Sequence, residues 1–233
     1  MYPIMEDIII LKIYGLHKDF FGGRNMVNAL ESISSVVEIL NLLPAEEMQH
    51  MKRVGILVDC FTEKLLLYDL YNECLETHKH FGRAAFYHDI GKVWIPNSIL
   101  TKPDRLTKSE RIIICDHPLY AQKLFAQIRQ GFISGIPEYL FQLAMDSSLY
   151  HHEWWNGNGY PYGIKRYEIP LIARITSICD AFDAMTSTRI YCKSHSYEYA
   201  CQELKKCAGT QFDPELVSAF LLMRPDTAFY FNA

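Results

Sequence analysis

The chain has 233 residues, of which 49% are hydrophobic and 21% charged, and these ordinary values exclude a disordered or collagen-like protein. Its net charge of -4 at pH 7 excludes the positive field that would coat a DNA or RNA polymer. The seven cysteines form no CxxC pair, so we expect reduced thiols in a cytoplasmic protein. We see no signal peptide and no run of the roughly 18 apolar residues that a membrane span needs, so we expect no membrane contact.

Apolar residues recur at spacings of three and four over residues 25–43, which predicts a helix there. Pro44 ends that helix and can open the next one. We interpret residues 1–43 as an N-terminal helical extension that packs against the rest of the chain or a dimer partner, because they are too few for a typical sensory domain. The second helix should bury one apolar face, made by Met51, Val54, Leu57, Val58, Phe61 and Leu65.

The remainder of the chain is also predicted to be helical. Residues 86–91 indicate a helix end, with Gly91 as its stop. Thr107 and Glu110 have the spacing of a capping box, which predicts a helix through Ile114. Further helices are expected over residues 137–152, 171–187, 197–206 and 214–223. Because we find no strand pattern and no internal repeat, the predicted fold class is all-α.

Residues 154–163 interrupt the helical pattern. They contain three glycines, Pro161 and two asparagines among four aromatic residues. This composition predicts an ordered glycine-rich loop.

Several histidines and carboxylates could hold a metal. His88 and Asp89 are adjacent, and an imidazole beside a carboxylate suits a divalent ion. His151 and His152 stand where the glycine-rich loop begins. Asp180 lies in an otherwise apolar helix, where an unpaired carboxylate is costly to bury, so either a metal or a salt bridge to Arg174 would compensate it.

Two further positions are ambiguous when taken alone. Glu46 and His50 are four residues apart, so they share a helix face and could chelate one ion. Glu46 could instead complement the dipole at the start of its helix. His117 precedes a proline near a helix terminus, where a single histidine is more often a cap or a surface residue.

Five segments of the chain, in order, resemble the HD-GYP domain, a subgroup of the HD phosphohydrolase superfamily: YHDIGKVWIPNSIL, DHPLYAQKLF, HHEWWNGNGYPYGIKRYEIPL, ARITSICDAFDAMTS and AGTQFDPELVSAFL. The resemblance extends from about residue 44 to residue 222. It implies an HD-domain helical bundle with an ordered GYP loop, and a catalytic domain over residues 44–233. The implied function is a metal-dependent phosphodiesterase that hydrolyses cyclic di-GMP to linear pGpG, with GMP as the alternative end product.

The resemblance also implies a set of metal ligands. They are His50, His88, Asp89, His117, His151, His152 and Asp180. Glu46 occupies the position that is associated with a three-metal site in some members, so we expect three divalent ions, or two without it. The mixed nitrogen and oxygen ligands suit iron or manganese, and the resemblance favours iron.

The catalytic residues implied are Asp89 and Lys92. Asp89 would bridge two ions whose shared water becomes hydroxide near neutral pH. Lys92 would contact the scissile phosphate or assist the leaving group, unless it only satisfies carbonyls at a helix end. Asp183, one turn beyond Asp180, is expected to support a ligand rather than to bind metal.

Substrate-binding residues are implied less completely. Arg189 matches a phosphate-binding arginine and could grip two phosphate oxygens. The basic residue expected three places later is Cys192 here, so Lys193 could take over that contact. Trp154 could stack on guanine or simply pack, and Tyr160 could line the pocket, contact a partner protein or play a structural role.

Two other functions stay open. One is hydrolysis of another cyclic dinucleotide, such as cyclic GMP-AMP. The other is a weakly active domain that binds the nucleotide and signals through a homodimer or a partner protein, which the changed residues after Arg189 would favour.

Overall fold

The computed structural model describes residues 33–67, 75–187 and 194–223, and these are helical. In these ranges the β-structure amounts to two isolated bridges, Ser35 with Ser134 and Ala208 with Phe212. The prediction of an all-α fold is therefore confirmed. Predictions for residues 1–32, and those for Arg189 and Lys193, lie outside the described residues.

The helix predicted over residues 25–43 is confirmed for residues 36–40 and is wrong for the other residues that can be compared, 33–35 and 41–43. Residues 33–35 are not helical, and helix α3 occupies only Val36–Leu40. Ser35 is extended, and its side chain caps the helix together with Glu38 in a reciprocal capping box. A cap of this kind fixes a helix start more firmly than apolar spacing does. Val36 and Ile39 belong to the main core, while the domain boundary at residue 43 stays a prediction.

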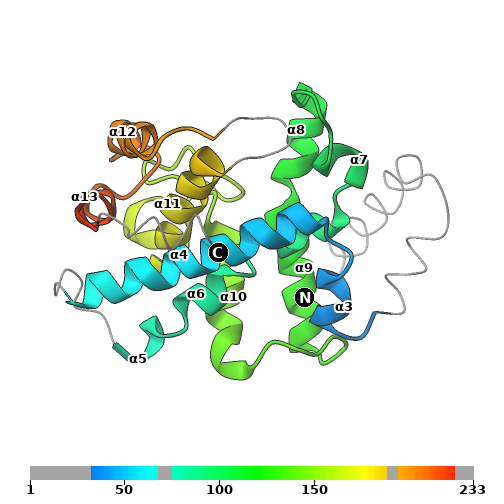
Figure 1. The fold of residues 1–233 in the computed structure, drawn as a ribbon. Helices are drawn as coiled ribbons and strands as arrows, with labels where there is room; N and C mark the ends of the chain where they lie inside the picture. The colour runs from blue at the N-terminus through cyan, green and yellow to red at the C-terminus, as the bar shows by residue number, and fades with distance from the viewer. Residues whose placement is uncertain (1–32, 68–74, 188–193, 224–233) are drawn as a thin grey trace.

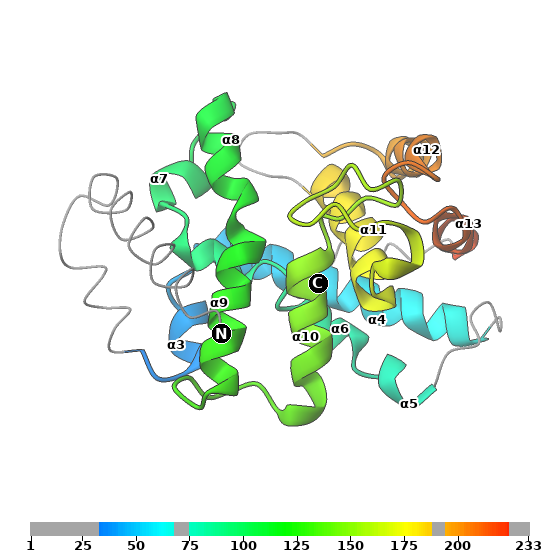
Figure 2. The same cartoon turned by 180° about the vertical axis from the view of Figure 1, so that it is seen from behind.

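Helix α4, Ala45–Leu67, begins after Pro44 as predicted. Its predicted apolar face is confirmed, because each of its members is buried in the core: Met51, Val54, Leu57, Val58, Phe61 and Leu65. This helix runs across the molecule, with α12 and α13 towards one end and α3 towards the other (Figures 1 and 2).

The segment after α4 is built from short elements: α5 Leu75–His78, α6 Phe81–Ala85, the 3-10 helix η1 Ile90–Trp94, and α7 Asn97–Leu100. The prediction that Gly91 stops a helix is wrong, because Gly91 lies inside η1. A β-carbon at this position would clash with the carbonyl oxygen of His117. Gly91 therefore permits the close backbone approach that brings η1 against α9.

The remaining elements are α8 Lys108–Cys115, α9 His117–Arg129, α10 Glu138–Tyr150, η2 Arg166–Glu168, α11 Leu171–Thr186, α12 Tyr197–Cys207 and α13 Pro214–Leu222. The capping box of Thr107 and Glu110 is present at α8, which confirms that prediction. The glycine-rich loop between α10 and α11 is ordered, as predicted. No helix in the described ranges is long and apolar enough to cross a bilayer.

The core joins helices that are distant in sequence. Phe61 of α4 and Phe182 of α11 each pack edge-on against Phe220 of α13, with ring centroids 5.1 and 5.2 Å apart. Arg174 of α11 forms a buried salt bridge to Asp213, with Nη1 2.7 Å from Oδ2. These contacts fix α4 and α11 side by side, and each of these two helices carries one of the predicted ligands.

Candidate metal centre

The seven residues implied as metal ligands converge from five parts of the fold. His50 comes from α4, His88 and Asp89 from the turn before η1, and Asp180 from α11. The others are His117, which begins α9, and His151 and His152, which follow α10. They form two groups in which the ligand atoms lie within 4.8 Å of one another: Asp89, His117, His151 and His152 in the first, and His50, His88 and Asp180 in the second.

Asp89 faces both groups, one with each carboxylate oxygen. Its Oδ1 lies 3.2 Å from Nε2 of His117 and 3.7 Å from Nε2 of His151. Its Oδ2 lies 3.2 Å from Nε2 of His88 and 3.6 Å from Nε2 of His50. A carboxylate placed in this way can bridge two ions.

Backbone carbonyls at helix ends set the orientation of three histidines. The Nδ1 atoms of His88, His117 and His151 lie 2.7–2.9 Å from carbonyl oxygens three or four residues earlier. A carbonyl oxygen only accepts hydrogen bonds, so each ring donates from Nδ1. These carbonyls belong to the last turns of α6, α8 and α10, so the end of a helix fixes the orientation of each ring. Because Nδ1 is taken up in this way, Nε2 of each ring points into the centre.

The centre is thus lined with acceptors that face one another. Nε2 of His50 lies 3.3 Å from Nε2 of His88, and Nε2 of His117 lies 3.4 Å from Nε2 of His151. Oδ1 of Asp89 is buried, and no donor among the described residues satisfies it. Buried acceptors without donors are costly, and a cation between them removes that cost. The residues present therefore fit divalent metal ions with nitrogen and oxygen ligands.

Protonation states agree with this fit. Burial lowers the pKa of His117 and of His152, so these rings are neutral, as metal ligands must be. Burial alone would raise the pKa of Asp89, but Lys92 and the neighbouring histidines hold it well below its usual range. Burial alone would also raise the pKa of Asp180, but His50, whose Nε2 lies 3.0 Å from its Oδ1, lowers it. Both carboxylates are charged at neutral pH.

Asp183 supports His50 from behind and is in neither ligand group. Its Oδ2 lies 2.6 Å from Nδ1 of His50, and the guanidinium of Arg53 donates to both of its oxygens at 2.8 and 3.0 Å. Ser187 donates to Oδ1 at 2.9 Å. Arg53 is not among the residues predicted from the sequence, although its position three residues after His50 on the same helix face was an available signal.

Glu46 is not brought to the centre. It is exposed in the first turn of α4, where it complements the helix dipole, and it belongs to neither group. Its neighbour Glu47 turns inward instead, and its Oε2 lies 2.8 Å from Nζ of Lys92. Glu46 was the reason to expect a third ion, and its position outside both groups removes that reason.

Nζ of Lys92 lies 2.6 Å from Oδ2 of Asp89. Burial alone would lower the pKa of Lys92, but the carboxylates of Asp89 and Glu47 raise it above its usual value. The ammonium group is therefore charged at neutral pH and lies beside the two ligand groups. It does not merely satisfy carbonyls at a helix end.

The salt bridge considered between Asp180 and Arg174 is absent. Arg174 instead pairs with Asp213 and donates from Nε to the carbonyl oxygen of Ile169. Asp180 turns the other way, and its Oδ1 lies 3.0 Å from Nε2 of His50.

The glycine-rich loop folds back over His152. The ring of Tyr160 stacks on His152, with centroids 4.7 Å apart and planes at 21°. A β-carbon at Gly159 would clash with the backbone nitrogen of Trp154, so glycine is required for the loop to close on itself. The buried carboxylate of Glu153 accepts a hydrogen bond from the backbone of Tyr162 at 2.7 Å. Trp154 is partly buried at the start of this loop, and its stacking on a base stays a prediction.

Comparison with known proteins agrees with this geometry. The family model described as HD domain matches residues 34–216. A cyclic di-GMP phosphodiesterase from Thermotoga maritima is 36% identical over 82% of this chain and 49% of its own length. A 3'3'-cGAMP-specific phosphodiesterase from Vibrio cholerae is 33% identical over 93% of this chain and 40% of its own.

Among solved structures, an HDG"Y"P protein from Bdellovibrio bacteriovorus has the same fold. The TM-score is 0.56 with 16% identity, over 79% of this chain and 55% of that one. The chain spans half or less of the length of the two curated relatives described above. The matched region contains all seven residues of the two ligand groups. On this evidence, the chain belongs to the HD domain family.

Proposed function

We propose that this chain is a metal-dependent phosphodiesterase that hydrolyses cyclic di-GMP to linear pGpG, with GMP as the alternative end product. The observation that carries the proposal is the position of Asp89, whose two oxygens each face a separate group of inward-pointing imidazole nitrogens. The relatives described above, which are named for the cyclic dinucleotides on which they act, support the substrate class.

Two divalent ions are proposed, one for each ligand group, with Asp89 shared between them. Iron is favoured and manganese is also suited, because the ligands mix imidazole with carboxylate. When bound, such ions supply positive charge against phosphate oxygens and make an attacking water more acidic. The backbone-anchored histidines hold their Nε2 atoms in place before any ion arrives, which lowers the cost of assembling the centre.

Lys92 is proposed to act on the substrate directly. Its ammonium group is held charged by Asp89 and Glu47. A scissile phosphate at the centre would compete with these carboxylates for the ammonium, which then offsets charge on the phosphate or on the leaving oxygen. Arg189 and Lys193 are retained as phosphate-binding residues from the resemblance alone, and Trp154 and Tyr160 as residues that line the substrate pocket.

Hydrolysis of cyclic GMP-AMP is the second candidate. It is favoured by the relative from Vibrio cholerae that is named for that substrate. A weakly active binding domain, working through a homodimer or a signalling protein in the cytoplasm, is the third. It rests on Cys192 standing where a basic residue is expected.

Product analysis separates these candidates. The protein is reconstituted with iron or manganese under anaerobic conditions and incubated with cyclic di-GMP, cyclic GMP-AMP or cyclic di-AMP. We expect linear product from cyclic di-GMP, and none from an Asp89→Asn variant that remains folded. A faster reaction with cyclic GMP-AMP would favour the second candidate, and binding without any linear product would favour the third.

A further inference from the structure

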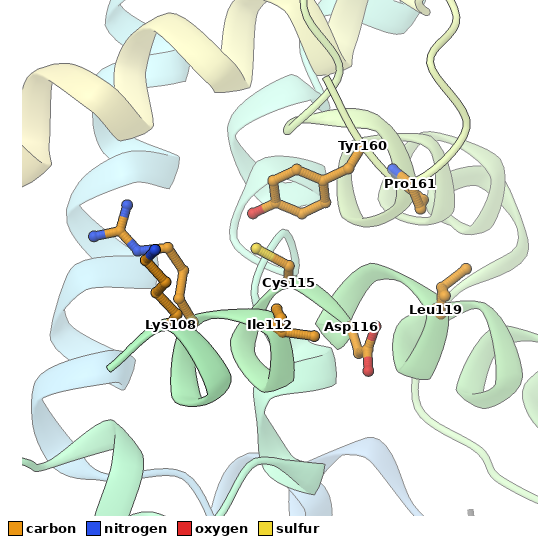
Figure 3. Close-up of a pocket in the computed structure, with 8 residues that line it drawn as sticks. Lys108, Ile112, Cys115, Asp116, Leu119, Tyr160 and Pro161 are labelled. Atoms are coloured by element: carbon orange, nitrogen blue, oxygen red, sulfur yellow. The ribbon is translucent and has the colours of Figure 1, made fainter. Parts of the chain in front are cut away.

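A cavity of about 470 Å³ lies beside the metal centre, between the α8–α9 segment and the glycine-rich loop (Figure 3). Its volume falls within the range of small-molecule sites. Figure 3 shows Tyr160 and Pro161 of the loop on one side and side chains of α8 on the other. The full lining is Lys108, Arg111, Ile112, Cys115, Asp116, Leu119, Tyr160 and Pro161.

The helical wall of this cavity is one continuous face. The lining positions on α8 and α9 follow spacings of three and four, which places them on the same side of the helices. Lys108 and Arg111 give one end of the face positive charge. Ile112 and Leu119 make it apolar further along, and Ile112 is 67% exposed. Asp116 carries the only carboxylate among the lining residues.

The positive end is available to a ligand. Lys108 and Arg111 are both exposed, and neither has a salt bridge within the described part of the chain. The nearest acidic residue in sequence, Glu110, is already engaged by Lys102 at 2.7 Å and by the backbone of Thr107. An anion could therefore bind here without displacing an existing ion pair.

Two residues of the cavity wall adjoin the metal centre. Tyr160 lines the cavity and also stacks on His152. Asp116 lines it and directly precedes His117. A ligand with one phosphate at the metal centre could therefore extend past Tyr160 into the cavity. A cyclic dinucleotide has a second phosphate and a second base, and both need a place while the first phosphate is attacked.

We propose that the cavity binds the half of the cyclic dinucleotide that is not being cleaved, with Lys108 and Arg111 holding its phosphate and the apolar wall contacting its base. The carboxylate of Asp116 repels an anion and so directs the phosphate to the opposite end. This inference rests on the proposed function, and it adds two specificity residues that neither the family resemblance nor the metal ligands include.

The test compares a large substrate with a small one. The holoenzyme, its Lys108→Ala and Arg111→Ala variants, and an Arg105→Ala control are assayed with cyclic di-GMP and with bis(p-nitrophenyl) phosphate, which has a single phosphodiester. Arg105 is exposed just before α8 and does not line the cavity, so its removal matches the change in net charge.

We expect the ratio of kcat/KM for cyclic di-GMP to that for the small ester to fall about tenfold in each variant, since a charged hydrogen bond contributes about that factor. The ratio in Arg105→Ala should be unchanged. Equal ratios in all four proteins would overturn the subsite while leaving the proposed function standing.

The proposed function can also fail on its own, if the wild type cleaves the small ester and not cyclic di-GMP. Equilibrium dialysis with cyclic di-GMP then tests whether the cavity binds the nucleotide. Binding that weakens about tenfold in Arg111→Ala and not in Arg105→Ala would support the subsite. Equal or absent binding would overturn it.

Discussion

The Nε2 atoms of His117 and His151 lie 3.4 Å apart, although both rings donate their Nδ1 hydrogens to backbone carbonyls. Two rings fixed in this way turn their Nε2 atoms towards each other. Asp89 adds a carboxylate oxygen 3.2 Å from the first ring. A cation between the groups would offset this arrangement of acceptors, and some of the predictions below depend on that cation.

The first prediction concerns the number of ions. Elemental analysis of the reconstituted protein should give about two ions per chain, because the described ligands form two groups. Glu46→Ala should leave that number unchanged, since Glu46 is exposed and outside both groups. Three ions in the wild type, falling to two in Glu46→Ala, would restore Glu46 as a ligand.

The second prediction concerns the support of His50. Asp183→Asn removes the charge that holds His50 and Arg53 together and lets the imidazole turn. We expect metal affinity to fall about 10- to 100-fold, the usual effect of losing such a partner. Competition with a chelator measures the affinity. Ser187→Ala, which removes one hydrogen bond to Asp183 and no charge, is the matched control and should change little.

The third prediction concerns pH and the stability of the fold. Burial raises the pKa of Asp146 from 3.8 to about 6, so the folded protein holds this proton more tightly than the unfolded chain does. The stabilisation from the protonated form is therefore complete below about pH 4 and is lost as the pH rises through about 6. Asp146→Asn, which carries no charge at any pH, should unfold at a higher temperature than the wild type at about pH 7.5, and at a similar temperature at about pH 3.5.

Thermal unfolding followed by circular dichroism tests that difference. The exposed Asp104→Asn variant removes the same formal charge from a site on the surface and is the control. An Asp146→Asn variant whose advantage is equal at both pH values would show that the charge at this position does not matter.

The fourth prediction concerns the contact between η1 and α9. Gly91→Ala places a methyl group against the carbonyl oxygen of His117, and backbone atoms on both sides leave no flexible side chain to move. We expect a lower unfolding temperature and weaker metal retention, because Asp89 and His117 are held together by this contact. Ser98→Ala, a change of similar size at an exposed position in α7, should have neither effect. Normal metal retention in Gly91→Ala would mean that the centre tolerates separation of these two elements.

The sequence predicted the helices that are marked by proline, by capping residues or by strong apolar spacing, such as α4 and α8. It also marked six of the seven residues of the two groups as candidate ligands, and the family resemblance joined them into one set and added His117. No local pattern relates His117 to Asp89, because they meet through the packing of α9 against η1.

Two salt bridges and the role of one glycine could not be predicted, because each depends on a partner that is distant in sequence. Residues three and four places before His50 lie on the same helix face as His50. The sequence therefore could not decide whether Glu46 or Glu47 turns towards the centre. In the structure it is Glu47, which pairs with Lys92. Arg174 pairs with Asp213, 39 residues away, and not with Asp180 in the same helix. Gly91 appeared to be a helix stop because its partner, the carbonyl of His117, is remote in sequence.

The central claim is that Asp89 bridges two ions, one held by each ligand group. Anomalous diffraction from crystals of the iron- or manganese-loaded protein tests it most directly. Two peaks are expected, one beside each oxygen of Asp89, with His117, His151 and His152 around the first and His50, His88 and Asp180 around the second. A single peak, or peaks that Asp89 does not touch, would contradict it.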